Sequence, residues 1–274
     1  MCRVFKVSRS GYYSWVNRKP SPLARNQELI SKEIEVAYHK SKGRYGSPKI
    51  TKELKSIGLS ASRQRVARIM KKKGLRSIIT GKFRVCTTDS NHDLEISANL
   101  LNREFIAAQP SEKWVSDLTY IRTQSGWLYL TIIMDLFDRK IIGWSMSTGM
   151  TAKETVIAAW KMAIRNRSVT KEMIFHSDRG VQYASCEFRN LLKAMSVQQS
   201  MSRKGNCWDN AVSENFFKIL KSETGYNTVY ASIEAAKREL FEFIEIWYNR
   251  QRRHSVLGYL TPEEFGNFIF KHAA

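Results

Sequence analysis

The chain has 274 residues, 43% of them hydrophobic, and a formal net charge of +20, which is typical of a folded basic protein large enough for two domains. No apolar run approaches the roughly 20 residues that a membrane span needs, and the N-terminus lacks the apolar core of a signal peptide, so we expect a cytoplasmic protein without a membrane partner. The four cysteines, Cys2, Cys86, Cys186 and Cys207, are too scattered for a zinc site or a redox pair, which favours free thiols.

The positive charge is concentrated at the front of the chain. Residues 1–88 hold 22 lysines and arginines against 4 acidic residues, a net charge of +18, whereas the remainder has a net charge of only +2. Lysine and arginine side chains release counterions from a phosphate backbone, so such a segment favours binding to nucleic acid. A basic helix lying on a membrane surface is the competing interpretation.

The front of the chain predicts an arm followed by a small all-α domain. Residues 1–23 form a basic, aromatic arm with a hinge at its end, and we expect it to be ordered only against a partner or DNA. Within residues 24–88, apolar residues recur at helical spacing from Leu29 to Ala37. Ser47 and Ser62 are then placed to cap two more helices. This order predicts a helix-turn-helix DNA-binding domain.

The last of these helices has two different faces. Val66, Ile69 and Met70 form an apolar stripe, which leaves polar and basic side chains on the outward face. In a major groove, arginine and glutamine contact base edges, and lysine contacts phosphates. A solvated basic helix in a small bundle is the alternative, but the basic character of the whole front third favours DNA. The candidate DNA-contacting residues are Arg63, Gln64, Arg65, Arg68 and Lys71.

The segment between the domains carries weaker patterns. Ile78 to Val85 is predicted to be a small wing or an extended connection, and the polar residues 87–91 mark a boundary. Residues 89–112 are interpreted as a linker, with a short helix from Leu94 to Phe105.

Residues 113–274 predict an α/β catalytic core with a helical C-terminal tail. Three successive strands are expected at Trp114–Arg122, Trp127–Asp135 and Lys140–Ser147, the first two as a hairpin. Helices and strands then alternate, and three antiparallel strands followed by such an alternation predict a mixed five-stranded sheet of the ribonuclease H-like type. The later elements are expected at Thr151–Arg165, Cys186–Met195, Trp208–Lys221 and Ile233–Tyr248 as helices and at Met173–Ser177 and Val197–Met201 as strands.

Three acidic residues lie on these elements. Asp117 lies on the first strand, Asp178 directly follows the fourth, and Glu214 lies on a helix with 35 residues between it and Asp178. Carboxylate oxygens suit Mg²⁺, and two such ions about 3.5 to 4 Å apart stabilise both the attacking and the leaving oxygen of a phosphodiester. A cap or a salt bridge is the usual role of a single acid, but the three together predict a two-metal site in which Asp117 bridges both ions.

The segments around these acids are distinctive: WVSDLTYI, MDLFDRKIIGWSM, HSDRGVQY, SMSRKGNCWDNAVSENFF and YNRQRRHSVLGYLTPEEF. Together they resemble the insertion-sequence transposases of bacteria, of the second-reading-frame (orfB) type, in the superfamily of DDE transposases and retroviral integrases. The resemblance runs from about Ser8 to the C-terminus. It implies an integrase-type catalytic core in which Asp117, Asp178 and Glu214 are the catalytic triad and hold two Mg²⁺ ions, for which Mn²⁺ substitutes.

The resemblance also assigns basic residues to DNA. Lys221, seven residues after Glu214, matches a basic residue that faces the terminal DNA, with a solvated lysine as the alternative. Arg179 lies in the loop after the second acid, where it can contact phosphates. Arg252, after the C-terminal helix, lies in a tail whose basic groups are aimed at DNA or are purely structural.

Four residues near the acids receive supporting roles. His176 is interpreted as a packing residue, because hard Mg²⁺ favours oxygen ligands. Trp208, Asp209 and Asn210 are interpreted first as structural support, with Asp209 and Asn210 capping the helix that carries Glu214, and second as DNA contacts.

The resemblance implies a transposase that cleaves insertion-sequence ends and transfers the strands, with a circular intermediate. Its partners are double-stranded DNA, both the terminal inverted repeats and the target, a homo-oligomer on that DNA, and the product of an upstream reading frame, because this chain starts where the downstream frame starts. Retroviral integrases carry an N-terminal zinc module that this chain lacks, so the helix-turn-helix takes the recognition role. A structure-selective nuclease of the same fold and a non-catalytic DNA-binding regulator that uses residues 24–88 are the alternatives.

Overall fold

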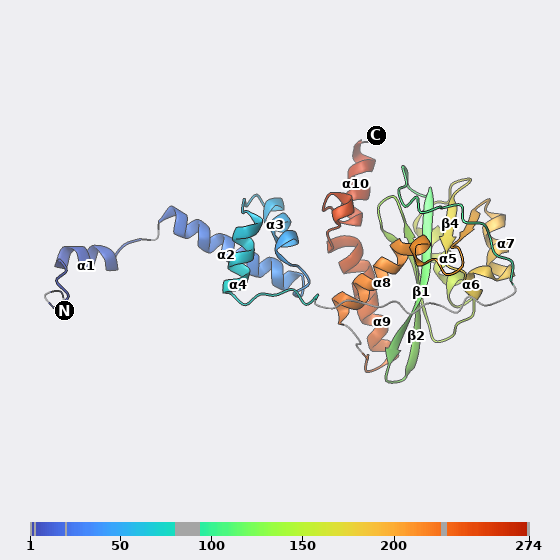
Figure 1. The fold of residues 1–274 in the computed structure, drawn as a ribbon, viewed down its shortest axis with the longest axis horizontal. Helices are drawn as coiled ribbons and strands as arrows, with labels where there is room; N and C mark the ends of the chain where they lie inside the picture. Colours follow the sequence, from blue (N-terminus) through green and yellow to red (C-terminus); the bar gives the residue numbers. More distant parts are fainter. Residues whose placement is uncertain (1, 3, 20, 80–93, 226–228, 273–274) are drawn as a thin grey trace. The chain divides into compact units, whose positions relative to one another are not determined.

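The computed structural model describes residues 2, 4–19, 21–79, 94–225 and 229–272. The chain divides into two compact units, residues 1–78 and 79–274, and each is described by itself (Figure 1). Most of the predicted wing and the whole of the polar boundary at residues 87–91 lie outside the described residues. In the part of the chain that the structure describes, no helix is both long and apolar enough to cross a bilayer.

The first unit is helical throughout its described elements, which are α1 (Arg9–Val16), α2 (Pro22–Lys40), α3 (Ser47–Ser56) and α4 (Arg63–Lys72). The hydroxyls of Ser8, Ser21 and Ser62 each accept a first-turn backbone amide of the helix that follows. In the predicted hinge, Ser21 is the cap and Pro22 the first residue of α2. The helix therefore begins seven residues before Leu29, where the apolar pattern in the sequence starts. The predicted cap of α3 is wrong by one residue, because Gly46 is the cap and Ser47 is already helical.

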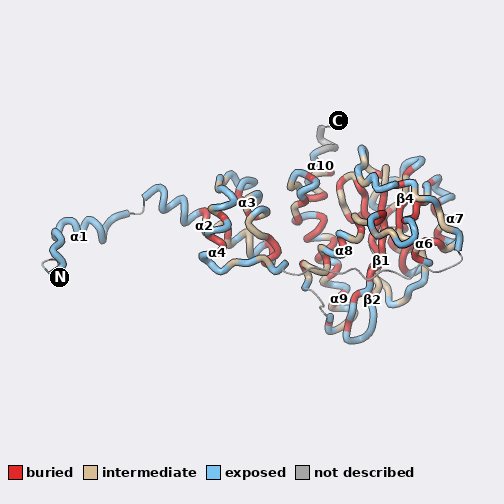
Figure 2. The backbone as a smooth tube through the Cα atoms, in the orientation of Figure 1, coloured by how far each residue is buried: buried red, intermediate tan, exposed pale blue. Residues whose placement is uncertain are grey.

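A small apolar core joins α2, α3 and α4, as the helix-turn-helix pattern predicts. α1 and the first two turns of α2 lie outside this core and are exposed along their whole length (Figure 2). The predicted arm thus contains a helix of its own. The core itself consists of Ile30 and Ile34 of α2, Ile50 and Leu54 of α3, and Val66 and Met70 of α4, all buried.

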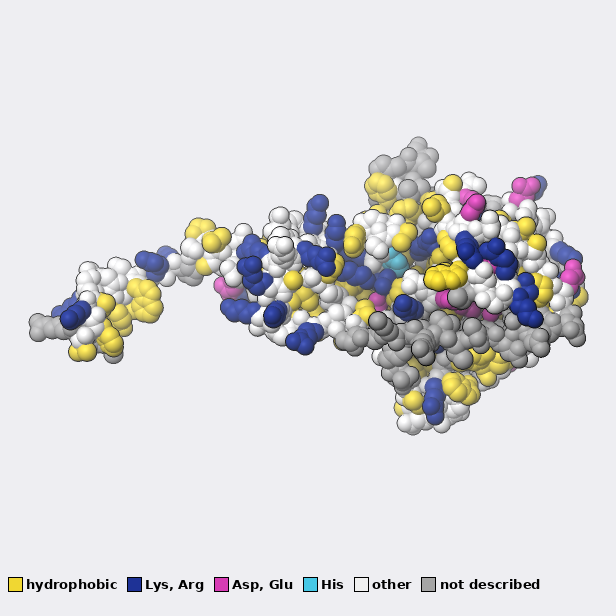
Figure 3. Space-filling model, viewed as in Figure 1, with side chains coloured by type: hydrophobic (Ala, Val, Ile, Leu, Met, Phe, Trp, Pro, Cys, Tyr) yellow, Lys and Arg dark blue, Asp and Glu magenta, His cyan; other side chains and the backbone are white. Residues whose placement is uncertain are grey.

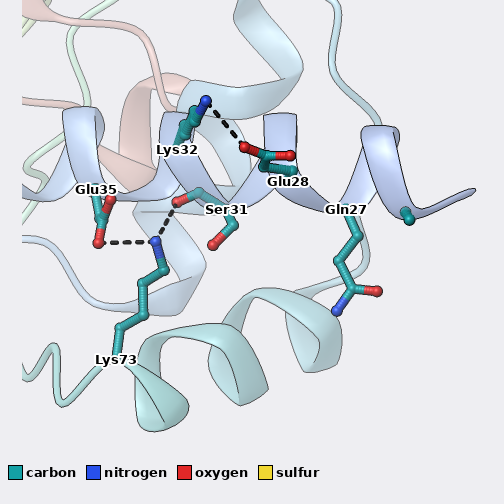
Figure 4. A pocket seen from close by; sticks show the side chains of 7 residues that line it. Gln27, Glu28, Ser31, Lys32, Glu35 and Lys73 are labelled. Atoms are coloured by element: carbon teal, nitrogen blue, oxygen red, sulfur yellow. Dashed lines mark hydrogen bonds and ion pairs between the residues drawn. The ribbon is translucent and has the colours of Figure 1, made fainter. Parts of the chain in front are cut away.

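Lys73, directly after α4, connects the end of that helix to α2. Its amine lies 2.8 Å from the Glu35 carboxylate and donates to the Ser31 carbonyl oxygen at 3.4 Å (Figure 4). Partly exposed ion pairs contribute at most about 1 kcal/mol, so this contact orients the end of α4 more than it stabilises the unit.

The second unit is built on a five-stranded mixed sheet with the order β3-β2-β1-β4-β5, which confirms the predicted fold class. β1 pairs antiparallel with β2 and β2 with β3, whereas β1–β4 and β4–β5 are parallel. Burial alternates only near the turn of the hairpin, whereas the rest of β2 and the first half of β1 are buried almost continuously, as expected for strands covered on both faces. The strands are β1 (Lys113–Thr123), β2 (Gly126–Asp135), β3 (Ile141–Ser147), β4 (Ile174–Ser177) and β5 (Gln198–Met201).

One face of the sheet is covered by α5 (Val156–Asn166), α6 (Val181–Ala184) and α7 (Cys186–Ala194). Trp160 of α5 and Phe188 of α7 pack on Phe175 of β4 with ring centroids 5.5 and 5.3 Å apart. α5 lies so close to β3 that only glycine fits at position 143: a Cβ there would lie only 2.4 Å from the Ala159 carbonyl oxygen. This layer forms the main apolar core of the unit.

The opposite face of the sheet is covered by the later helices. The helix predicted from Trp208 is a 3₁₀ turn, η1 (Cys207–Asn210), followed by α8 (Ala211–Thr224). The predicted C-terminal helix is α9 (Ile233–Phe241), which continues as a π-helix, η2 (Glu242–Gln251). Phe216 of α8 contacts Tyr248 of η2 with ring centroids 4.8 Å apart, which anchors the tail on the core. A short turn, η3 (Ser255–Leu257), and α10 (Pro262–His272) follow.

The helix predicted from Leu94 to Phe105 is wrong. Residues 94–105 are extended or turning, and Asn102 and Arg103 have φ angles of 44° and 65°, which a right-handed helix excludes. The amides of Leu100 and Leu101 donate to the Ser200 hydroxyl of β5 at 2.9 and 3.2 Å. This segment therefore belongs to the second unit and runs beside β5.

Candidate active site

The three predicted acids come together at one place in the second unit. Trp114 and Val115 of β1 lie opposite Phe175 and His176 of β4, so continuing this parallel register places Asp117 level with Asp178. α8 packs on β1 and carries Glu214 in its first turn.

The start of α8 is fastened to the strand that bears Asp117. The Asn210 side-chain amide donates to the Ser116 carbonyl oxygen at 3.2 Å. Behind the strand, the Ser116 hydroxyl lies 2.8 Å from the buried Tyr183 hydroxyl and donates to the Ile132 carbonyl oxygen at 2.7 Å. Buried polar groups that are satisfied in this way hold a backbone position firmly, so the carboxylates rest on a rigid support.

The carboxylates act on one another electrostatically. Burial raises the pKa of the Asp117 carboxyl well above its usual range, and the charge of Asp178 raises it further. Glu214 acts on that pKa in the same direction, while the Leu118 amide and the Lys221 ammonium lower it. Burial and then Asp178 also raise the pKa of Glu214. The three carboxyl groups therefore bring more negative charge to the site than the Lys221 ammonium compensates.

This donor set fits a divalent cation in chemistry and in charge. Three carboxylates supply the hard oxygen ligands that Mg²⁺ prefers, and a cation would relieve their mutual repulsion. Asp117 accepts the Leu118 amide at 2.8 Å and Asp178 accepts the Gly180 amide at 2.9 Å, so one oxygen of each is held by backbone. Among the described residues, no three histidine, cysteine or acidic side chains are already gathered closely enough to hold an ion.

Lys221 lies on the same helix as Glu214, two turns further on, and is partly buried. Its ammonium group lowers the pKa of Asp117, so Lys221 is close enough to the acids to act on them electrostatically. This is the position that the sequence analysis predicts, while contact with DNA stays a prediction.

His176 has the packing role that its sequence context predicts. The ring is buried between two serines, with Nδ1 2.8 Å from the Ser200 hydroxyl and Nε2 3.3 Å from the Ser202 hydroxyl. Burial lowers the pKa of His176 to about 4, so the imidazole is neutral at physiological pH.

Arg179 joins the two loops that flank the acids. Its Nε donates to the Ser202 carbonyl oxygen at 2.7 Å, and the Ser202 amide donates to the Ser177 carbonyl oxygen at 2.9 Å. Part of the guanidinium group therefore supports the loop structure, and its contact with phosphate remains a prediction.

The predicted capping role of Asp209 and Asn210 is wrong. The Asp209 carboxylate is fully buried and accepts hydrogen bonds from the backbone and guanidinium of Arg203, from Arg103 and from Asn99. These bonds, chiefly from Arg203, hold the pKa of Asp209 well below its usual range. Asn210 occupies the cap position of α8, but its side chain makes no capping hydrogen bond and reaches β1 instead. Two of these hydrogen-bond donors, Asn99 and Arg103, lie more than 100 residues from Asp209 in the sequence, so sequence spacing does not reveal them.

Arg252 has the structural role that the sequence analysis gives as the alternative to contact with DNA. Its side chain is only 10% exposed, and Nε donates to the Glu223 carboxylate of α8 at 3.0 Å. Trp247 donates to the other oxygen of the same carboxylate at 2.7 Å. A buried charge pair of this kind fixes the tail on the core and leaves little of the guanidinium group for DNA.

The predicted DNA-contacting face of α4 is presented to solvent. Val66, Ile69 and Met70 are buried as expected. The outward residues are Arg63, Gln64, Arg68 and Lys71, which are exposed, and Arg65, which is partly exposed. The structure thus leaves these side chains available, and their contacts with bases or phosphates remain predictions.

Family models match most of the chain. Residues 24–83 match an HTH-like domain, and residues 107–207 and 195–262 match two models described as integrase core domain. With the mixed sheet and its three acids, these matches define an HTH-like domain joined to an integrase core.

Two curated relatives are similar to this chain over nearly its whole length. The chain is 43% identical over all 274 residues to the insertion element IS600 uncharacterized 31 kDa protein of Shigella sonnei, covering all of both proteins. It is 41% identical over 269 residues to transposase InsF for insertion sequence IS3A of Escherichia coli, covering 97% of this chain and 93% of that protein. The chain belongs to this family of insertion-sequence transposases with an integrase core.

Solved structures share more distant similarity. The catalytic core domain of HTLV-2 integrase, solved in complex with magnesium in a trimeric form, is 18% identical and aligns with a TM-score of 0.43 over 57% of this chain and 96% of that chain. A chain of the simian T-cell lymphotropic virus intasome, solved in complex with PP2A regulatory subunit B56 gamma, is 15% identical, with a TM-score of 0.43 over 79% of this chain and 69% of that chain.

Proposed function

We propose that this chain is a DNA transposase whose catalytic acids are Asp117, Asp178 and Glu214. The observation that carries the proposal is their convergence: the register of β1 and β4 sets Asp117 level with Asp178, α8 with Glu214 packs on β1, and the charge of Asp178 raises the pKa of both Asp117 and Glu214. In the reaction, water attacks a phosphodiester at an element end and frees a 3′-hydroxyl, and that hydroxyl then attacks a phosphodiester of the second DNA segment. Each step exchanges one P–O bond for another, so no redox partner is required.

The proposed cofactor is a pair of Mg²⁺ ions, with Mn²⁺ as a substitute. Bound ions of this kind supply charge stabilisation for the attacking and leaving oxygens. In this proposal Asp117 would contribute to both ions, Asp178 to one and Glu214 to the other. Burial of Asp117 keeps bulk water from screening these charges, and the proposed role of Lys221 is to position the terminal DNA.

DNA recognition is assigned to the first unit. The exposed basic face of α4 is proposed to enter the major groove of the terminal repeats, with Arg63, Gln64, Arg65, Arg68 and Lys71 as contacts. Arg179 of the second unit is a proposed phosphate contact. The proposed setting is the bacterial cytoplasm, with the protein on the nucleoid when bound, as a homo-oligomer on DNA that also associates with an upstream-frame product.

The decisive test replaces one acid without changing its shape. We expect Glu214→Gln and Asp178→Asn each to abolish both cleavage and joining of a duplex that carries the terminal inverted repeats flanking this gene, in the presence of Mg²⁺. Glu187→Gln is the matched control, because Glu187 also lies in the first turn of a helix of this unit but is exposed. Undiminished products from the Glu214 and Asp178 variants would refute the proposed triad. A wild-type protein that cuts this duplex but never joins a supplied 3′-hydroxyl end would be a nuclease instead.

A further inference from the structure

The turn that precedes α8 presents a tryptophan to solvent. In η1, Trp208 is 68% exposed, whereas the next two residues, Asp209 and Asn210, are buried. Trp114 and Trp160 of the same unit are fully buried, as is usual for a side chain with so large an apolar surface, and Trp127 near the hairpin turn is 53% exposed, still less than Trp208. An indole exposed to this degree gives up the stabilisation that burial would provide, so its position needs another reason.

The backbone beneath Trp208 is firmly anchored. The neighbouring Asp209 carboxylate accepts from the Arg203 amide at 3.0 Å, from the Arg203 guanidinium at 2.7 and 2.8 Å, from Arg103 at 2.8 Å and from Asn99 at 2.9 Å. A turn anchored in this way is already ordered before a ligand stacks on the ring that it carries, so binding costs no backbone ordering, which favours binding.

The segment that carries Trp208 is tied at both ends to the strands of the acids. At its start, the Ser202 amide donates to the Ser177 carbonyl oxygen, immediately before Asp178. At its end, the Asn210 side chain donates to the Ser116 carbonyl oxygen, immediately before Asp117. Glu214 follows one helical turn later. Trp208 therefore stands at the edge of the proposed active site.

The surroundings of Trp208 are basic. The Arg103 and Arg203 side chains are 45% and 49% exposed, and the two guanidinium groups share a single carboxylate, that of Asp209, so the cluster keeps positive charge. Lys204 on the same loop is also exposed. On the face of the catalytic unit that Figure 3 shows, basic and hydrophobic side chains lie side by side near acidic ones. An aromatic face with flanking cations is the surface that binds an unpaired nucleobase and its phosphates.

We propose that Trp208 is a stacking platform for one unpaired base at the DNA end undergoing cleavage or joining. This inference rests on the proposed transposase function. A scissile phosphate reaches the acids more readily if the base pairs beside it open, and opening exposes an apolar base face. The Trp208 ring covers that face. Because every base has such a face, the platform accepts any base and supplies position without sequence preference.

The test uses the full-length chain and the terminal-repeat duplex, intact or with a single abasic site placed at successive positions around the scissile phosphate. We expect Trp208→Ala to slow cleavage of the intact duplex by about tenfold to a hundredfold and Trp208→Phe to keep most of the rate. One abasic position should slow the wild type by the same factor and cause no further loss in Trp208→Ala. At that position, 2-aminopurine should be quenched by the wild type and not by Trp208→Ala.

Phe268→Ala is the control, because Phe268 is a 52% exposed aromatic residue of the same unit on α10. It should cleave like the wild type, and the thermal unfolding of Trp208→Ala should match that of the wild type. A Trp208→Ala protein that cleaves the intact duplex at the wild-type rate would overturn the inference. So would a loss of equal size on every abasic substrate, which would assign Trp208 to a protein contact. Both outcomes require an active wild-type protein with an inactive Glu214→Gln variant, so they are distinct from failure of the transposase assignment.

Discussion

At the residue scale, Asp209 and Arg252 take their roles from distant partners, Arg103 and Glu223, which lie 106 and 29 residues away. Sequence spacing does not reveal these partners, so the capping role predicted for Asp209 was wrong, and the structural role of Arg252 stood only as an alternative to contact with DNA. Asp117, Asp178 and Glu214 could be proposed from the sequence because each lies in a distinctive segment, whereas their convergence comes from the fold. An arginine in a basic tail looks like a DNA contact until the fold supplies a buried carboxylate for it.

His176 provides a prediction about pH at this scale. Its folded-state pKa of about 4 lies below the usual value of 6.5, so the unfolded chain binds the proton more readily. The stability that the neutral ring contributes is therefore present above about pH 6.5 and is lost as the pH falls toward 4. Between pH 7 and pH 4.5 we expect this residue to account for a loss on the order of 2 kcal/mol in the free energy of unfolding.

Urea unfolding of wild type and His176→Asn at the two pH values measures this contribution. The variant should lose less stability on acidification than the wild type, whatever its stability at pH 7. His39→Asn serves as the control, since His39 is exposed at the end of α2. An equal pH dependence in His176→Asn and wild type would contradict the assignment of a buried neutral ring.

At the element scale, strands and helices were predictable where the pattern is local. The hairpin of β1 and β2 was expected from two apolar, β-rich runs separated by a short polar turn, and all five strands occur where they were expected, within a few residues. The segment from Leu94 was wrongly predicted to be a helix. It runs beside β5, to which its backbone is hydrogen-bonded, and its backbone turns at Asn102. The π-helical form of η2 likewise has no sequence pattern that sets it apart from an ordinary amphipathic helix.

The corner between β2 and β3 shows what the conspicuous segment MDLFDRK does. Asp135 is buried and accepts from the Ser111 amide at 2.8 Å, the Trp114 indole at 3.1 Å and Arg167 at 2.7 Å. Arg167 also contacts Asp138 at 2.7 Å. Asp135 and Asp138, the two acids of this segment, are thus the partners of one arginine directly after α5.

Removing Arg167 should therefore destabilise the whole catalytic unit. Arg167→Ala leaves two buried carboxylates without their cation, so we expect the free energy of unfolding to fall by about 3–5 kcal/mol. Lys140→Ala is the control, because the Lys140 amine lies 4.0 Å from Glu263 and both side chains are partly exposed, so its loss should cost less than about 1 kcal/mol. Chemical denaturation monitored by tryptophan fluorescence compares the two, and similar small losses would show that the buried network is not what holds the corner.

At the scale of the whole molecule, charge and chemistry are divided between the two parts of the sequence. The net charge of +18 lies in residues 1–88, and the nearly balanced remainder carries the acids. A positive field attracts DNA at long range, while cleavage needs a site that gathers negative charge around a cation. Within the catalytic unit, the Lys221 ammonium on α8 is a cation that lowers the pKa of Asp117.

This division predicts different effects on binding and on catalysis. If the α4 face neutralises DNA phosphates, each lost contact releases about one counterion fewer, so Arg63→Ala and Arg68→Ala should each reduce the slope of log K against log salt by roughly one. Glu214→Gln should leave that slope unchanged, because it alters the other unit. Fluorescence anisotropy of a labelled terminal-repeat duplex at several salt concentrations measures all of these variants. Lys32→Ala is the control, since Lys32 is exposed on α2 and pairs with Glu28 at 3.1 Å. If the control lowers the slope as much as Arg63→Ala does, the attraction comes from the general charge of the unit and the α4 face is not a defined DNA-binding surface.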